Sequence, residues 1–280
     1  MNTNYEVRYA SSPKEVKAMD TAALRENFLI DNLFVADKIN LTYSHYDRLI
    51  VGGVLPVKGG LALDTIDPLK ADYFLERREL GIINVGHAGS VSVDGTSYDL
   101  DFKEALYVGR GSKEVIFSSN AVDKPANFYI NSAPAHQAYP TKKVTKDEAE
   151  IVELGSLETA NHRIINKLLV NSVVQTCQLQ MGMTELKTGS VWNTMPAHVH
   201  DRRMEAYFYF EVKEGQSVSH FMGQPEETRH IWMQDKEAVI SAPWSIHAGS
   251  GTSNYTFIWG MAGENLDYDD MDKWAINDLK

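Results

Sequence analysis

The strongest constraint on the fold is a pattern of short β-rich segments that occurs twice along the chain. Gly, Asp-Gly and Pro turn signals separate the segments at close spacing, which is typical of antiparallel sandwiches and barrels. The two copies contain matching stretches at an offset of about 130 residues, as a duplicated domain does. The matching pairs are 50–60 with 180–190, 74–85 with 199–210, and 126–134 with 255–263. We therefore predict a mainly β chain with two tandem β-sandwich or small-barrel domains.

Helix signals are confined to the two ends of the chain. Ser12-Pro13 predicts an N-cap and first helical residue, and Asp20 or Thr21 caps a second helical stretch. The acidic tail is expected to form a terminal helix with its apolar side chains inward, namely Met271, Trp274, Ala275 and Leu279. The polar, proline-marked stretch around residue 140 indicates a linker. The expected domains are 1–140 with a helical N-terminal arm, a linker over 141–155, and 156–280.

Charge and cysteine content exclude several classes of partner. The net charge of −11 argues against binding to nucleic acid or to an anionic membrane surface. A small anionic substrate would need a local basic patch that acts against this overall field. The single cysteine, Cys177, excludes an intramolecular disulfide and a Cys-rich zinc site, which fits a reducing cytosol. With no secretory signal and no long apolar run visible, we expect a cytoplasmic protein.

The stretch PAHVHDRRMEAYFY, residues 196–209, contains a candidate metal site. His198 and His200 are two residues apart, so both rings project from one face of an extended strand. Glu205 is five residues after His200, an odd number that would place it on the opposite face of a straight strand. The polar run 201–203 can supply a turn that brings Glu205 back to the face of the two histidines. Two imidazoles and one carboxylate form a partial shell for a divalent transition metal.

A fourth ligand is expected at His247, which Pro243 and Gly249 flank. The combination of H-x-H, a following glutamate and a later P-x-x-x-H resembles the two-motif pattern of the cupin family. Ser245 stands where that family usually has a glycine, and the spacers are longer. All four ligand types are nevertheless present, and the resemblance implies a bicupin, with two jelly-roll domains.

The N-terminal copy lacks the metal ligands. When the copies are aligned on their shared Arg-Arg pair, Leu75 and Leu80 stand where His200 and Glu205 stand, and Tyr73 corresponds to His198. We therefore predict one metal site per chain, in the C-terminal domain.

Longer stretches carry a closer resemblance. FLERRELGIINVG, VWNTMPAHVHDRRMEAYFYF, GQPEETRHI, WSIHAGSGT and YTFIWGMAGEN are similar to the 5-keto-4-deoxyuronate isomerase family, over a region from about Thr21 to the C-terminus. The resemblance implies one Zn²⁺ per chain and a cytoplasmic homo-oligomer, a hexamer. It also implies an aldose–ketose isomerase of pectin and hexuronate breakdown. Its small anionic sugar-acid substrate would be 5-dehydro-4-deoxy-D-glucuronate, and the product 3-deoxy-D-glycero-2,5-hexodiulosonate.

Such an isomerisation through an enediolate needs a base and groups that bind the substrate oxygens. The candidate bases are His220 and His230. His220 would lie on the same face of its strand as Val218 and Met222, which is the face expected to point to the interior. Tyr207 and Tyr209 follow Glu205 on its face and are candidates to hydrogen-bond the substrate. A hydride shift in place of the enediolate is also open.

The substrate carboxylate needs a fork of N–H donors, which arginine supplies. We prefer Arg229, with Gln224 and Arg202 as further candidates. Arg202-Arg203 recurs as Arg77-Arg78 in the metal-free copy. That recurrence favours a structural role for the pair.

Other functions share this metal shell. Three histidines and one glutamate on a cupin also suit the iron of a dioxygenase, which oxygen consumption would reveal. A non-catalytic sugar-binding or storage cupin is a second alternative. Storage proteins usually carry a secretory signal, which is not seen here. A regulatory cupin should carry a DNA-binding helical domain, and the helical stretches before Val35 are too short for one. A phosphosugar isomerase has only the local motifs in its favour.

Overall fold

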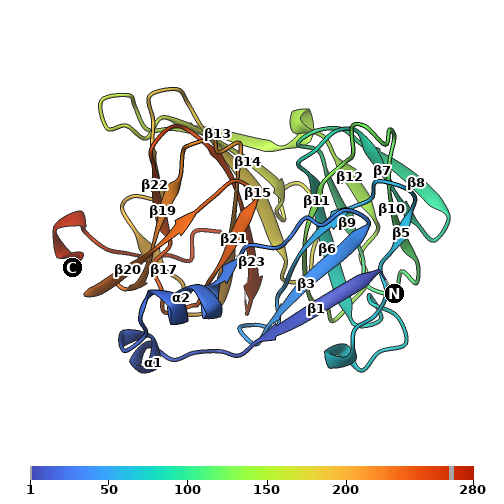
Figure 1. The fold of residues 1–280 in the computed structure, drawn as a ribbon, viewed down its shortest axis with the longest axis horizontal. Helices are drawn as coiled ribbons and strands as arrows, with labels where there is room; N and C mark the ends of the chain where they lie inside the picture. Colours follow the sequence, from blue (N-terminus) through green and yellow to red (C-terminus); the bar gives the residue numbers. More distant parts are fainter. Residues whose placement is uncertain (1, 265–267) are drawn as a thin grey trace. The chain divides into compact units, whose positions relative to one another are not determined.

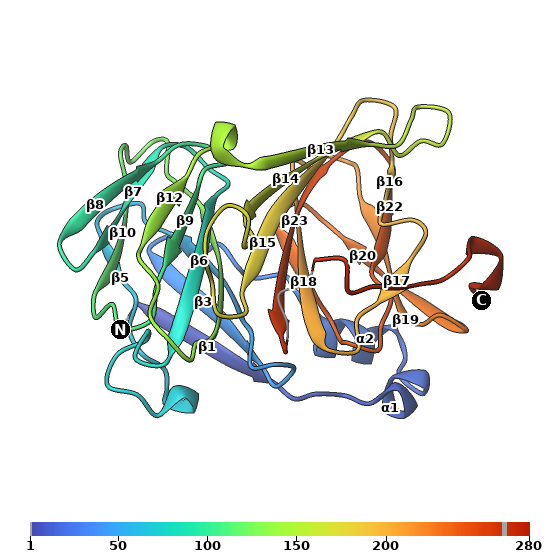
Figure 2. The same cartoon turned by 180° about the vertical axis from the view of Figure 1, so that it is seen from behind.

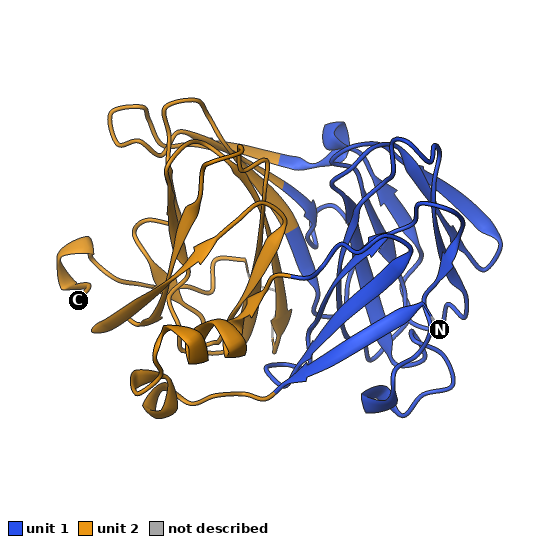
Figure 3. Cartoon of the chain, in the orientation of Figure 1, with its two compact units in different colours: residues 1–8, 32–150, 167–181 blue, residues 9–31, 151–166, 182–280 orange. Residues whose placement is uncertain are grey.

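Two sets of β-sheets with the same strand order make up the structure, a computed structural model that describes residues 2–264 and 268–280 (Figure 1). In this described part, each set has a larger sheet of seven strands and a smaller sheet of four. Packing divides the chain into two compact units, residues 1–8, 32–150 and 167–181 in the first, and 9–31, 151–166 and 182–280 in the second (Figure 3). The predicted mainly β fold is confirmed. The domain boundaries at 140 and 155 stay a prediction, because packing alone defines these units.

The first larger sheet has the order β1 (Thr3–Arg8), β3 (Lys38–Ser44), β4 (Ile50–Leu55), β11 (Phe128–Pro134), β6 (Arg78–Asn84), β9 (Ala105–Val108) and β12 (Lys142–Val144). Its smaller partner has the order β5 (Leu61–Ala62), β10 (Val115–Ser119), β7 (Gly89–Val93) and β8 (Thr96–Leu100). Leu41 and Ile82 of the larger sheet share one buried cluster with Val91 and Phe117 of the smaller sheet. The two sheets therefore form a sandwich around a common core.

The second larger sheet has the order β13 (Glu150–Leu154), β14 (Arg163–Leu169), β15 (Gln180–Leu186), β23 (Thr256–Gly263), β18 (Arg203–Phe210), β21 (Glu237–Ser241) and β2 (Leu29–Ile30). The smaller sheet has the order β16 (Trp192–Asn193), β22 (Ala248–Gly251), β19 (Val218–Gln224) and β20 (Glu227–Met233), and a further pair joins β17 (His198–Val199) to β24 (Asp272–Lys273). Figure 2 shows these strands from behind.

The two sheet orders place the sequence repeats on equivalent strands. Position by position, β4 corresponds to β15, β6 to β18 and β11 to β23. These are the strands that the three matched stretches of sequence contain. In the metal-free copy, Leu75 and Leu80 are buried in the hydrophobic core, so apolar packing has replaced the ligand positions.

The helix starts follow the predicted capping chemistry. Helix α1 (Pro13–Lys17) begins after Ser12, whose backbone N–H donates to Glu15 Oε2 at 2.6 Å in a capping box. Helix α2 (Thr21–Phe28) begins after Asp20, whose carboxylate accepts from Ala23 N at 2.9 Å. This arm, expected with the N-terminal domain, packs in the second unit. None of the described helices is long and apolar enough to cross a membrane.

Residues 268–280 of the C-terminal tail contain no α-helix and are largely extended, and residues 265–267 lie outside the described part of the chain. Strand β24 pairs antiparallel with β17, and Trp274 N donates to Ala197 O at 3.0 Å. Only the three-residue 3-10 helix η3 (Ile276–Asp278) follows, and Ala275 is exposed rather than inward. The backbone groups that a helix would pair internally are instead used to hold the tail beside β17. The remaining 3-10 turns are η1 (Asp67–Leu69) and η2 (Lys146–Glu148).

One buried carboxylate ties together the first unit. Glu79 accepts from the Tyr107 hydroxyl and from the backbone N–H groups of Cys177, Gln178 and Leu179, all at 2.8–2.9 Å. A charge buried in this way is stabilised by its hydrogen bonds, and its removal leaves several buried donors unpaired.

We expect Glu79→Ala to lower the free energy of unfolding by about 3–5 kcal/mol, because three backbone donors lose their acceptor. Urea denaturation measures this loss. Glu158→Ala, which removes an exposed carboxylate, is the matched control and should change stability by less than ~0.5 kcal/mol. Equal midpoints for both variants would contradict a structural role for Glu79.

Candidate active site

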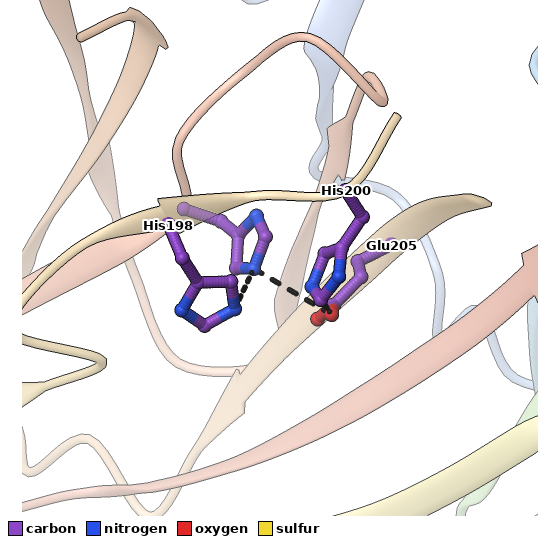
Figure 4. A group of neighbouring side chains, drawn as sticks. His198, His200 and Glu205 are labelled. Atoms are coloured by element: carbon purple, nitrogen blue, oxygen red, sulfur yellow. Dashed lines mark hydrogen bonds and ion pairs between the residues drawn. The ribbon is translucent and has the colours of Figure 1, made fainter. Parts of the chain in front are cut away.

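The four side chains predicted as metal ligands converge in the second unit. Figure 4 shows three of them, His198, His200 and Glu205, pointing toward one another. His198 lies on β17, His200 follows that strand, Glu205 lies on β18, and His247 directly precedes β22. One donor atom from each side chain lies within 4.8 Å of the others. A turn at residues 201–202 separates β17 from β18, so the predicted reset of the strand register is present.

The separations between donor atoms test whether a metal fits. His200 Nε2 lies 2.7 Å from Glu205 Oε1, and His247 Nε2 lies 3.0 Å from His198 Nε2 and 3.5 Å from Glu205 Oε1. Ligand atoms bound tetrahedrally at ~2.0–2.2 Å from a zinc ion are themselves ~3.3–3.6 Å apart. One of the three separations lies in this range and two are shorter, so the donor atoms already converge on one point. Three imidazole nitrogens and one carboxylate oxygen are donors that suit a divalent metal ion.

Hydrogen bonds on the far side of two rings orient them for this role. Nδ1 of His200 donates to the backbone carbonyl of Asp270. Nδ1 of His247 lies 3.2 Å from the Ser241 hydroxyl. A proton held on Nδ1 leaves the lone pair of Nε2 directed at the cluster, which is how metal-ligating histidines are usually fixed.

Burial keeps the cluster in the protonation states that bind metal. Desolvation lowers the pKa of His198 to about 4 although Glu205 opposes the shift, and it lowers the pKa of His247 well below the usual value. Desolvation alone would raise the pKa of Glu205, but the neighbouring His247 and His200 hold it below its ordinary range. The lowered pKa values of His198 and His247 favour neutral rings, and the lowered pKa of Glu205 favours the ionised carboxylate. These are the forms that bind a metal ion.

A cavity of about 320 Å³ opens beside the cluster. His198, His200 and Glu205 line it together with aromatic side chains from β18 and β23, including Tyr207 and Trp259. A volume of this size suits a small molecule. The C-terminal segment contributes Tyr268, Asp269, Met271 and Lys273 to the lining.

The hydroxyl of Tyr207, in the cavity wall, contacts Thr194, a residue with an uncommon backbone conformation. The Tyr207 hydroxyl lies 2.9 Å from the hydroxyl of Thr194, which also lines the cavity. Thr194 has a φ of 49°, a left-handed conformation that costs a β-branched residue about 1–2 kcal/mol. Burial raises the pKa of Tyr207 well above its usual value, so its phenol stays a neutral hydrogen-bond donor.

His220 and Tyr209 lie behind this wall rather than in it. The Tyr209 hydroxyl is 2.8 Å from His220 Nδ1, both side chains are buried, and neither lines the cavity. Desolvation lowers the pKa of His220 to about 3, so the ring is neutral. The ring centroids of His220 and Tyr207 are 5.7 Å apart.

The structure does not bring four other sequence candidates to the cavity. Arg229 donates to the carbonyls of Val16 and Met19 at 3.1 and 2.6 Å and so holds the end of α1. Gln224 lies beside it against the same helix. Arg229 shares the inward face of β20 with Ile231 and Met233, but α1, distant in sequence, covers that end of the strand.

His230 and Arg202 are surface residues, which corrects their expected roles. His230 is exposed on the outward face of β20, with its ring beside that of Trp232. The exposed Arg202 forms an ion pair with Glu264 at 3.0 Å. Its neighbour Arg203 is buried, lines the cavity and donates to the carbonyl of Tyr268 at 2.9 Å.

The residues that the sequence did not indicate for the cavity include Arg163, Thr194 and Tyr268. Arg163 is the first residue of β14, Thr194 follows β16, and Tyr268 lies in the tail for which we expected a helix. Thr194 is only four residues from His198, but no motif marked it, and the approach of Arg163 depends on the order of strands in the sheet.

We expect the purified protein to contain one divalent metal ion per chain, and His198→Ala and His247→Ala to lose it. Elemental analysis measures the stoichiometry. Chelation should lower Tm, because a ligand that binds only the folded state stabilises it by about 4 kcal/mol at a thousandfold excess over Kd. His230→Ala is the matched control and should keep its metal. Full metal content in either ligand variant would contradict the site.

Comparison with known proteins agrees with this geometry. The KduI/IolB family model matches residues 39–277. A 4-deoxy-L-threo-5-hexosulose-uronate ketol-isomerase of Formosa agariphila is 67% identical over 280 residues, which cover 100% of both chains. Enzymes of the same name from Bacteroides fragilis, strain YCH46, and from Escherichia coli, strain SMS-3-5, are 60% and 54% identical; the alignments cover 100% and 98% of this chain and 100% of each relative.

Solved structures share the fold at low identity. An IolB-like protein from Salmonella typhimurium LT2 aligns with a TM-score of 0.66 at 14% identity, covering 81% of this chain and 86% of that one. An oxalate decarboxylase from Lactobacillus farciminis aligns at 0.54 and 9% identity, covering 80% and 79%. These likenesses concern the fold alone, and they agree with the predicted bicupin. Since the family model covers most of the sequence and the named relatives match it throughout, the chain belongs to the KduI/IolB family.

Proposed function

We propose that this protein is a metal-dependent ketol-isomerase that converts 5-dehydro-4-deoxy-D-glucuronate into 3-deoxy-D-glycero-2,5-hexodiulosonate. The observation that carries the proposal is the full-length likeness to named ketol-isomerases, at 67% identity in the Formosa agariphila relative. The buried cluster of three histidines and one glutamate beside a small cavity gives that likeness a chemical basis.

The proposed cofactor is one Zn²⁺ per chain, held by His198, His200, Glu205 and His247. When bound, such an ion would act as a Lewis acid toward the substrate carbonyl and its neighbouring hydroxyl, and would stabilise negative charge on these oxygens. The apolar and aromatic lining of the cavity limits water and strengthens these electrostatic effects.

Tyr207 is the residue we assign to the reacting oxygens. As a neutral phenol in the cavity wall, it donates a hydrogen bond to a substrate oxygen on which negative charge develops. Thr194 holds that hydroxyl in place, and the neutral Tyr209–His220 pair supports the ring from behind. His220 therefore acts as a positioning residue rather than as a base in contact with substrate.

We further propose that the protein is cytoplasmic. We also propose that it assembles into a homo-oligomer, a hexamer. Cys177 is a buried free thiol, which suits a reducing compartment. The net charge of −11 argues against nucleic acid and anionic membranes as partners. Sedimentation of the purified protein measures the oligomer.

We expect the metal-loaded protein to convert the unsaturated-uronate breakdown product into the ketose, as followed by NMR. His198→Ala should lower kcat/KM by at least about a hundredfold, because the Lewis acid is lost. In D₂O, deuterium at the carbon that receives the proton would indicate an enediolate. Oxygen consumption without ketose formation would instead support a dioxygenase and contradict the proposal.

Variants of the two hydroxyls test the role of Tyr207. Tyr207→Phe should lower kcat by about 10²–10³, the usual effect of losing one donor to a developing oxyanion. Thr194→Val should lower kcat by roughly tenfold, while Thr194→Ser, which keeps the hydroxyl, should stay within about twofold. The double variant Tyr207→Phe/Thr194→Val should be no slower than Tyr207→Phe alone. Losses that multiply in the double variant would show that Thr194 does not act through Tyr207.

A further inference from the structure

Three cationic side chains line the cavity beside the metal ligands, namely Arg163, Arg203 and Lys273. A sugar acid that enters a protein of net charge −11 moves against the overall field, so one of these cations must attract it locally. Their surroundings differ enough to separate their roles.

Arg203 is part of the framework of the site. It is buried, donates to the carbonyl of Tyr268, and its Nε lies 3.3 Å from His200 Nδ1. Its counterpart Arg78, in the metal-free copy, is also buried and donates to backbone carbonyls, those of Arg48 at 2.7 Å and Ser132 at 2.6 Å. An arginine that holds backbone carbonyls in both copies, with and without metal ligands, has a structural role.

Lys273 stands at the mouth of the cavity. It is exposed, on β24, opposite His198 in the strand register. An exposed ammonium is a strongly hydrated point charge, and solvent and salt screen its attraction for a substrate. It can attract an anion but does not fix its orientation.

Arg163 has the surroundings of a ligand-binding arginine. It is half-buried at the start of β14, and one guanidinium nitrogen, Nη1, donates to the carbonyl of Asn161 at 2.9 Å. Its electrostatic neighbours are the phenols of Tyr207, Tyr268 and Tyr255. Among residues 2–264 and 268–280, no carboxylate forms an ion pair with it.

A partly desolvated guanidinium with spare N–H groups, and with no acidic partner in the part of the chain that the structure describes, is complementary to a planar anion. Its fork donates two parallel hydrogen bonds to one carboxylate, and partial burial strengthens them. Because Arg163 and three of the ligands line one cavity of about 320 Å³, a small sugar acid can contact both. We propose that Arg163 binds the substrate's carboxylate and so selects uronates over neutral sugars; this inference rests on the proposed function.

The kinetic test compares Arg163→Gln and Arg163→Lys with Arg202→Gln, which removes the same charge from an exposed position outside the cavity. Arg163→Gln should raise KM for the uronate by roughly 10–100-fold, the worth of a hydrogen-bonded charge pair, and lower kcat much less. Arg163→Lys should recover part of this loss, and Arg202→Gln should match the wild type. Metal content and Tm should be unchanged in all three. An unchanged KM in Arg163→Gln overturns the inference while the isomerase itself stands.

A binding test separates this inference from the reaction. D-Glucuronate and its neutral counterpart D-glucose serve as probes in calorimetric titrations of the metal-loaded protein. We expect the wild type to bind the acid more tightly than the neutral sugar, and Arg163→Gln to lose that preference. This outcome supports the carboxylate subsite even if no ketose forms and the proposed function fails. A preference retained in Arg163→Gln, or absent from the wild type, overturns it.

Discussion

The burial of Glu205 among three imidazoles is the interaction on which the site depends. A carboxylate removed from water is costly unless a positive charge or several donors face it. Burial lowers the pKa of His198 and of His247 and so favours their neutral forms, which bind metal ions. A cation at their common point satisfies all four side chains together. In the metal-free copy the equivalent position is Leu80, which packs in the core and needs no such partner.

The duplication separates what the fold needs from what the chemistry needs. Arg203 and Arg78 are buried at equivalent positions and both hold backbone carbonyls, with metal ligands nearby in one copy and leucines in the other. The sandwich therefore forms without a metal shell. Residues that differ between the copies and line the cavity, such as His200 and Tyr207, are better candidates for function than those the copies share.

The spacing of residues along the sequence was enough to predict the convergence of three metal ligands and the starts of both helices. Strand parity and a turn between β17 and β18 placed His198, His200 and Glu205 together, and side-chain capping chemistry set the helix starts. Contacts between distant segments were not predictable. Arg229 has the correct parity, but its end of β20 is covered by α1. Arg163 reaches the cavity because of the order of strands in the sheet, which no short pattern encodes.

The C-terminal tail shows why the metal centre and the substrate cavity form one system. The backbone carbonyl of Asp270 accepts a hydrogen bond from Nδ1–H of His200, and β24 pairs with the strand of His198. The same segment places Tyr268 and Lys273 in the cavity lining. The ligand geometry and the cavity wall therefore depend on the same contacts. Because metal binding favours the arrangement in which Nε2 of His200 faces the cluster, it also favours the hydrogen bond from Nδ1 to Asp270 that holds this segment beside the cavity.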